Sequence, residues 1–144
     1  MPRLSALMIR CSLVSLLLGS TAGALLLGQF PPALSRMPQL RAMHLDLLLF
    51  GWLVQFVLGV AYWILPRHAT RPVRGPWAPA AIGFVLFQGG LVLALLGSAM
   101  PALRALAPTG RLLLAGASLL FAVLLVPRIK PFGNPGASPS DISH

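Results

Sequence analysis

The sequence contains four long apolar runs, each bounded by proline, glycine or arginine. They cover about residues 7–30, 42–65, 78–100 and 111–126. A bilayer core of about 30 Å takes roughly 20 residues of α-helix, a length that the first three runs reach. The fourth is shorter, so it spans only if Arg111 extends its side chain to the headgroups or the bilayer thins. We therefore predict an all-α polytopic membrane protein, a four-transmembrane-helix bundle over residues 1–130.

The composition agrees with a lipid bilayer as the solvent. Hydrophobic residues make up 57% of the 144 residues and charged ones 9%, whereas a soluble domain carries about 25% charged residues. The net charge of +9 comes from basic residues in the gaps between the runs, where they orient helices and meet anionic headgroups. No basic face or aromatic platform accompanies them, so we expect no nucleic-acid partner.

The basic residues also predict the orientation. If the N-terminus is inside, the inner side carries seven of them and the outer side four. The inner group is Arg3, Arg10, Arg67, Arg71, Arg74, Arg128 and Lys130, and the outer group is Arg36, Arg41, Arg104 and Arg111. The positive-inside rule then places both termini in the cytoplasm. Residues 131–144 are rich in Pro, Gly and Ser, which predicts a disordered cytoplasmic tail.

The first run has one alternative interpretation, a cleaved signal peptide. It begins with Arg3 and Arg10 and contains a small-residue stretch, but its apolar part is longer than an ordinary signal sequence. We therefore predict a retained helix. Cys11 is the single cysteine, which excludes an intramolecular disulfide and predicts a small apolar residue in that helix.

Small residues inside the runs predict where helices touch, because lipid gives helices no hydrophobic reason to associate. They occur in each run and equally fit a homo-oligomer. The set is Gly19, Gly23, Gly28, Gly51, Gly59, Gly89, Gly90, Gly116 and Ser118, with Gln55 and Gln88 as mid-run amides.

The second run carries a histidine close to its start. Steps of three and four residues from it give one helical face: His44, Leu48, Gly51, Gln55, Gly59, Tyr62 and Pro66. An imidazole beside missing side chains is a surface that a flat metal cofactor such as haem needs. The alternative is that His44 bonds to a backbone carbonyl and the glycines only pack. Asp46 lies about 200° around the helix from His44, where it faces a neighbouring helix or pairs with Arg41 or Arg36.

This stretch resembles the second transmembrane helix of haem–copper oxidase subunit I, including its nitric-oxide-reductase and cbb3-type branches. It is even more similar to short four-helix subunit-I-like membrane proteins of bacteria. The residues that carry the resemblance are His44, Gly51, Trp52, Gly59, Tyr62, Pro66 and Arg67. The resemblance implies that His44 is an axial ligand of haem b near the outer face of a bacterial inner membrane. Asp46 stands where such proteins often have a second histidine.

Two hypotheses follow. In the first, the protein binds haem b through His44, beside Gly51, Gln55, Gly59 and Tyr62, and transfers electrons to a quinone or a respiratory complex. The sixth ligand is then His44 of a second copy in a homodimer, Met43, Met100, or a small gas that the protein senses. In the second, the chain is a cofactor-free accessory subunit of a respiratory complex.

Other activities are disfavoured. The family's copper and active-site haem ligands lie on later helices without a counterpart among these runs, so we expect no reduction of oxygen or nitric oxide by this chain alone. Whether it is an enzyme stays open. A transporter is disfavoured because the sequence has no inverted repeat, broken midplane helix or deeply placed acidic residue. His68, in a basic loop, and His144, in the tail, have no chemical context.

Overall fold

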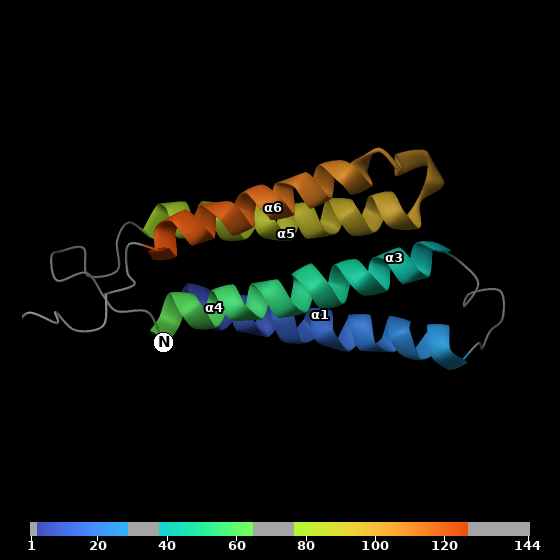
Figure 1. The fold of residues 1–144 in the computed structure, drawn as a ribbon, viewed down its shortest axis with the longest axis horizontal. Coiled ribbons are helices and arrows are strands. Elements are labelled where there is room, and N and C mark those ends of the chain that lie inside the picture. Colours follow the sequence, from blue (N-terminus) through green and yellow to red (C-terminus); the bar gives the residue numbers. More distant parts are fainter. Residues whose placement is uncertain (1–2, 29–37, 65–76, 127–144) are drawn as a thin grey trace, which may run out of the picture.

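The computed structural model describes residues 3–28, 38–64 and 77–126, and four long helices account for most of them (Figure 1). The first is α1, Arg3–Gly28. The second span is continuous but has three parts: α3, Pro38–Asp46, a π-helical segment η1, Leu47–Val54, and α4, Gln55–Ile64. The third and fourth are α5, Trp77–Ala99, and α6, Leu106–Leu125, with the short 3-10 turn η2, Pro101–Leu103, between them.

All four helices are long and apolar enough to cross a membrane, and no strand occurs in the described ranges. The prediction of an all-α fold with four candidate membrane spans is therefore confirmed. Large apolar side chains stay exposed on the outside of the bundle; Leu17, Val85 and Leu112 are 68%, 67% and 74% exposed. A surface this apolar suits contact with lipid.

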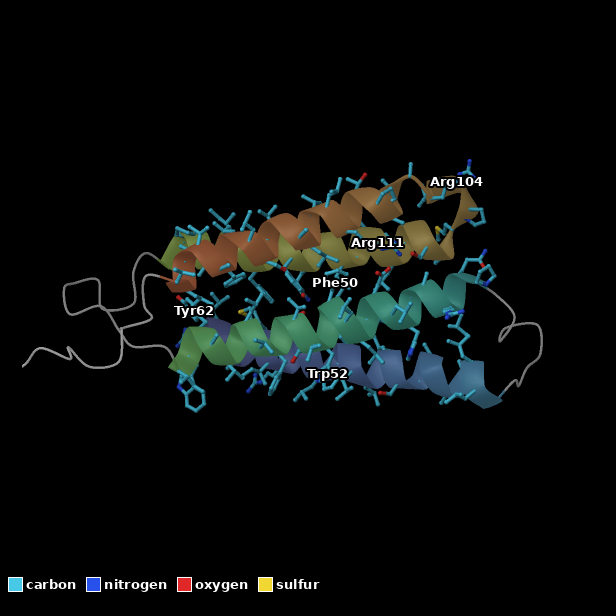
Figure 2. The ribbon with its side chains drawn as sticks, in the orientation of Figure 1. Phe50, Trp52, Tyr62, Arg104 and Arg111 are labelled. Atoms are coloured by element: carbon cyan, nitrogen blue, oxygen red, sulfur yellow. The ribbon has the colours of Figure 1, made fainter. Side chains whose placement is uncertain are left out.

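The helices form two hairpins that face each other. α1 packs along the whole second span, α5 packs along α6, and α3 contacts α5 across the middle. The start of α1 and the end of α6 lie at the same end of the bundle (Figure 1). Phe50 and Tyr62 lie between the hairpins (Figure 2), and Tyr62 belongs to a buried apolar cluster with Met8 and Phe121.

Three helices begin earlier than predicted, and proline explains two of the differences. α1 begins at Arg3 rather than at about 7. The second span begins at Pro38 rather than at 42, and α6 begins at Leu106 rather than at 111. Proline is tolerated in the first turn of a helix because the N–H groups there have no intrahelical acceptor. Pro38 and Pro108 both occupy such positions. α6 is therefore 20 residues long, and the prediction of a short fourth span was wrong.

Glycines bring α5 and α6 together. Gly83, Gly90 and Gly97 lie seven residues apart along α5 and are all buried. A Cβ added at Gly90 would lie 2.9 Å from the carbonyl oxygen of Gly110, so no larger residue fits without moving a backbone. Close backbone approach of this kind is how small residues hold membrane helices together.

The small residues predicted at helix contacts divide into two groups. A Cβ added at Gly19, Gly23, Gly51, Gly59 or Gly90 would meet a neighbouring helix, as predicted. A Cβ added at Gly28, Gly89 or Gly116 would meet nothing within 4 Å. The prediction that these three pack against other helices of the same chain was therefore wrong.

A π-helical segment lies within the second span, between His44 and Gln55. In a π-helix the backbone bonds run from residue i to i+5, and such segments often occur at functional sites. The side chains that follow the segment are consequently rotated, relative to those before it, from where an unbroken α-helix would place them. Even so, His44, Gly51, Gln55 and Gly59 all contact α1, so the predicted stripe keeps one neighbouring helix on both sides of the segment.

Candidate functional site

His44 lies in the contact between α1 and α3. Its Nδ1 is 2.8 Å from the carbonyl oxygen of Gly19. Because a carbonyl oxygen can only accept, we assign the ring proton to Nδ1, which donates this hydrogen bond. In the neutral imidazole the lone pair is then on Nε2, the nitrogen that remains for a metal.

Gly23 makes the space in which the imidazole lies. A Cβ added there would be 2.7 Å from Cε1 of His44 and 3.1 Å from Nδ1. Gly19 and Gly23, one helical turn apart on α1, therefore act on the same ring: one accepts its proton and the other leaves room for it. A backbone acceptor at the second ring nitrogen is the usual arrangement of a metal-binding histidine, because it fixes the tautomer and the ring orientation.

A pocket opens beside this ring. Its volume is about 440 Å³, and its lining residues are Gly23, Leu26, Leu27, Arg41, His44 and Leu45. Ligand pockets are typically mostly apolar with a few polar groups at fixed points. Here the walls are aliphatic, the imidazole is one polar group and the exposed Arg41 is the other. These residues fit a haem, whose iron takes an imidazole nitrogen, whose ring suits apolar walls and whose carboxylates suit a guanidinium.

The other residues predicted to bind the cofactor lie elsewhere, against α1 or in the core. A Cβ at Gly51 would lie 2.8 Å from Ser15, and one at Gly59 would lie 3.1 Å from Cβ of Met8. Gln55 donates from Nε2 to the carbonyl oxygen of Met8 at 3.2 Å. The structure thus brings Gly51, Gln55 and Gly59 together with α1 and not with the pocket beside His44.

Serines on α1 add hydrogen bonds and small buried side chains to the contact between α1 and the second span. Ser5 donates from Oγ to the carbonyl oxygen of Gly59 at 2.6 Å, and Ser5, Ser12 and Ser15 are all buried. Tyr62, the fifth predicted residue, is 4% exposed in the apolar core between the hairpins. Side-chain hydrogen bonds and close backbone contacts therefore hold the second span to α1 along most of its length.

Asp46 forms an ion pair with Arg111. Arg111 donates from Nε to Oδ1 at 3.1 Å and from Nη2 to Oδ2 at 2.9 Å. The Asp46 side chain is 6% exposed and that of Arg111 is 43% exposed. The pair joins α3 to α6, and therefore one hairpin to the other; Arg111 is labelled in Figure 2. A two-point contact between a guanidinium and a carboxylate fixes geometry as well as charge.

This ion pair bears on three predictions. Asp46 faces a neighbouring helix, as one alternative predicted, and pairs there with Arg111 rather than with Arg41; Arg36 is outside the described residues. Arg111 binds a carboxylate inside the bundle instead of only extending to the headgroups. Asp46 is the last of the 9 residues of α3, so this acidic group lies deeper in its span than predicted. The sequence did hold a signal: the chain has only two acidic residues, and one of them stands in an apolar run.

No group of three His, Cys, Asp or Glu side chains in residues 3–28, 38–64 and 77–126 is arranged to hold a metal ion. A metal at His44 would thus need most of its ligands from a cofactor, as haem iron has from its porphyrin. Pro66, Arg67, His68, His144 and the tail 131–144 lie outside the described residues.

Comparison with known proteins identified no relative: no protein-family model, no curated protein and no solved structure matches this chain.

Proposed function

We propose that this chain is an integral membrane protein that binds a b-type haem through Nε2 of His44 and transfers electrons within a respiratory chain. The observation that carries the proposal is the hydrogen bond from Nδ1 of His44 to the Gly19 carbonyl oxygen at 2.8 Å. It leaves Nε2 as the unprotonated nitrogen of a ring that lines an apolar pocket. The resemblance of the second span to haem–copper oxidase subunit I supports the same assignment.

Each residue of the pocket has a part in this function. Gly19 fixes the tautomer and the direction of the imidazole, and Gly23 leaves room for the ring. Leu26, Leu27 and Leu45 exclude water, which influences the reduction potential of a bound haem. Arg41 offers a guanidinium to a carboxylate at the exposed rim. Haem itself supplies one-electron chemistry when bound.

The first test is an absorption spectrum of the detergent-purified full chain, produced with ample haem supply. We expect a Soret band and a reduced-minus-oxidised difference spectrum of b type. His44→Ala should lose both, while His68→Ala, which changes a histidine of the basic stretch between the second and third apolar runs, should keep them. The position of the bands would also show whether a strong-field ligand occupies the sixth position of the haem iron. A colourless wild-type preparation, or an unchanged spectrum in His44→Ala, would contradict the proposal.

A second function is favoured by a different observation. Cβ atoms added at Gly51 and Gly59 would lie 2.8 Å from Ser15 and 3.1 Å from Met8 of α1, so α1 covers the residues that the sequence predicted to line a cofactor. This is the packing expected of a cofactor-free accessory subunit of a membrane respiratory complex. In that case the chain would co-purify from its native membrane with a larger complex, and no haem of that complex would depend on His44.

A further inference from the structure

One polar side chain lies at the middle of α5 without a hydrogen bond. Gln88 is the central residue of Trp77–Ala99, so in a bilayer it sits at the greatest depth. Its Oε1 is buried and has no partner. None of the hydrogen bonds among the described residues involves its Nε2 either. Gln55 of the second span differs in that its Nε2 donates to the carbonyl oxygen of Met8, although its Oε1 is likewise buried without a partner.

An unpaired amide is costly in this place. The hydrocarbon core holds no water to take the free donor and acceptor, and each unsatisfied polar group there costs free energy. Membrane helices meet this cost by hydrogen bonds between glutamine side chains on neighbouring helices. The partner of Gln88 is therefore expected on a helix outside the described part of the bundle.

The surface around Gln88 is shaped to receive such a helix. A groove of about 490 Å³ runs along the outer face of α5, lined by Phe84, Val85, Gln88, Gly89, Val92 and Leu93. Gly89 stands beside the amide, and a Cβ there would meet nothing within 4 Å, so another backbone can approach closely. Val85, Gly89 and Val92 follow each other at steps of four and three residues, the spacing of one helical face.

We propose that this groove is the interface of a homodimer in which Gln88 of one copy pairs with Gln88 of the other. An amide carries both a donor and an acceptor, so two copies of it satisfy each other once each side chain turns its Oε1 from the buried position toward the groove. All copies insert in the same orientation, so the two-fold axis runs along the membrane normal, and each residue near it meets its own counterpart at the same depth. Gln88 of one copy therefore meets Gln88 of the other at the same depth, and neither copy has to move along the membrane normal.

The proposal does not depend on His44. The groove lies on the α5–α6 hairpin, whereas the pocket beside His44 is formed by α1 and α3. Dimerisation can therefore be measured in colourless protein, and haem can be measured in a monomeric variant. Failure of one proposal leaves the other intact.

The main experiment measures self-association of the full chain in phosphatidylcholine vesicles, by energy transfer between labelled copies as the lipid-to-protein ratio rises. We expect a dimer for the wild type and about tenfold weaker association for Gln88→Leu. The matched control is Gly116→Ala, which changes an open, exposed position on α6 and should associate like the wild type. Circular dichroism should be unchanged in both variants, because Gln88 has no internal bond to lose.

Cross-linking gives an independent readout. In a Cys11→Ser background, Gly89→Cys should form a disulfide between copies in vesicles under mild oxidation, and Gly116→Cys should not. A monomeric wild type, unchanged association of Gln88→Leu, or equal cross-linking at 89 and 116 would each overturn the proposal. Monomers that associate only with a different protein through Gln88 would likewise assign the groove to a hetero-partner and overturn it.

Discussion

At the scale of single residues, Gly23 tests whether the histidine site is built as described. In Gly23→Ala the new methyl would lie 2.7 Å from Cε1 of His44, so the ring must turn and its bond to Gly19 is lost. Gly116→Ala makes the same change on a helix with open space around it. Both substitutions raise the helix propensity equally, so this effect cancels in the comparison. We therefore expect the Gly23→Ala protein to be less stable than the Gly116→Ala protein by about 1 kcal/mol, the net value of the lost hydrogen bond.

Unfolding in detergent, followed by circular dichroism, measures this difference. If haem is bound, the Soret band should also weaken in Gly23→Ala and stay unchanged in Gly116→Ala. Equal stability and equal haem content in the two variants would mean that the imidazole does not depend on this glycine.

The sequence predicted part of this site and missed part of it. His44 and the Gly19–Gly23 pair could be singled out because an ionisable group and small residues are unusual features of an apolar run. The bond between His44 and Gly19 joins residues 25 positions apart, and only the pairing of two helices brings them together. The same holds for Asp46 and Arg111, which are 65 positions apart.

At the scale of helices, the ion pair between Asp46 and Arg111 should contribute asymmetrically to stability. Asp46 is buried, so Arg111→Leu leaves a carboxylate without a partner, a loss of about 3–5 kcal/mol by analogy with other buried pairs. Asp46→Leu leaves a half-exposed guanidinium that reaches the headgroups, so its effect should be smaller. The double variant removes both charges and should recover most of the loss, because isosteric apolar residues often replace a buried pair at little cost.

A double-mutant cycle on the free energy of unfolding in detergent measures these terms. Arg104→Leu is the control, because Arg104 is exposed at the end of the bundle (Figure 2). Additive effects of Asp46→Leu and Arg111→Leu, or equal losses in the two single variants, would contradict the account of this pair.

The existence of the four helices was easier to predict than where they begin, where they depart from α-helical geometry and which helices pair. Hydropathy alone located all four spans, because a bilayer demands long apolar runs. The starts of the second and fourth spans were placed too late, at about 42 and 111, because the residues before them are less apolar, although the first turn of a helix accepts Pro38 and Pro108. The π-helical segment of the second span has no signature in the apolar run Leu47–Val54, whereas α-helical spacing correctly placed His44, Gly51 and Gln55 toward one neighbour, α1. The packing of Gly83, Gly90 and Gly97 against α6 requires the partner helix to be recognised.

At the scale of the whole molecule, the orientation in the membrane decides on which side His44 acts. The start of α1 and the end of α6 lie at one end of the bundle (Figure 1), as an even number of spans requires. Arg104 and the turn η2 lie at the other end (Figure 2). The excess of basic residues near the termini favours a cytoplasmic location for both, which places the pocket beside His44 toward the outer face.

Labelling of single cysteines in intact cells tests this orientation. In a Cys11→Ser background, a membrane-impermeant maleimide should label Ala102→Cys, next to the exposed turn η2, before the cells are opened. Ser140→Cys should be labelled only after lysis, because we place the C-terminus in the cytoplasm. The reverse labelling pattern would show that the bundle has the opposite orientation, with the pocket on the cytoplasmic side. A haem at His44 would then exchange electrons with partners on that side, against what the resemblance to the oxidase helix implies.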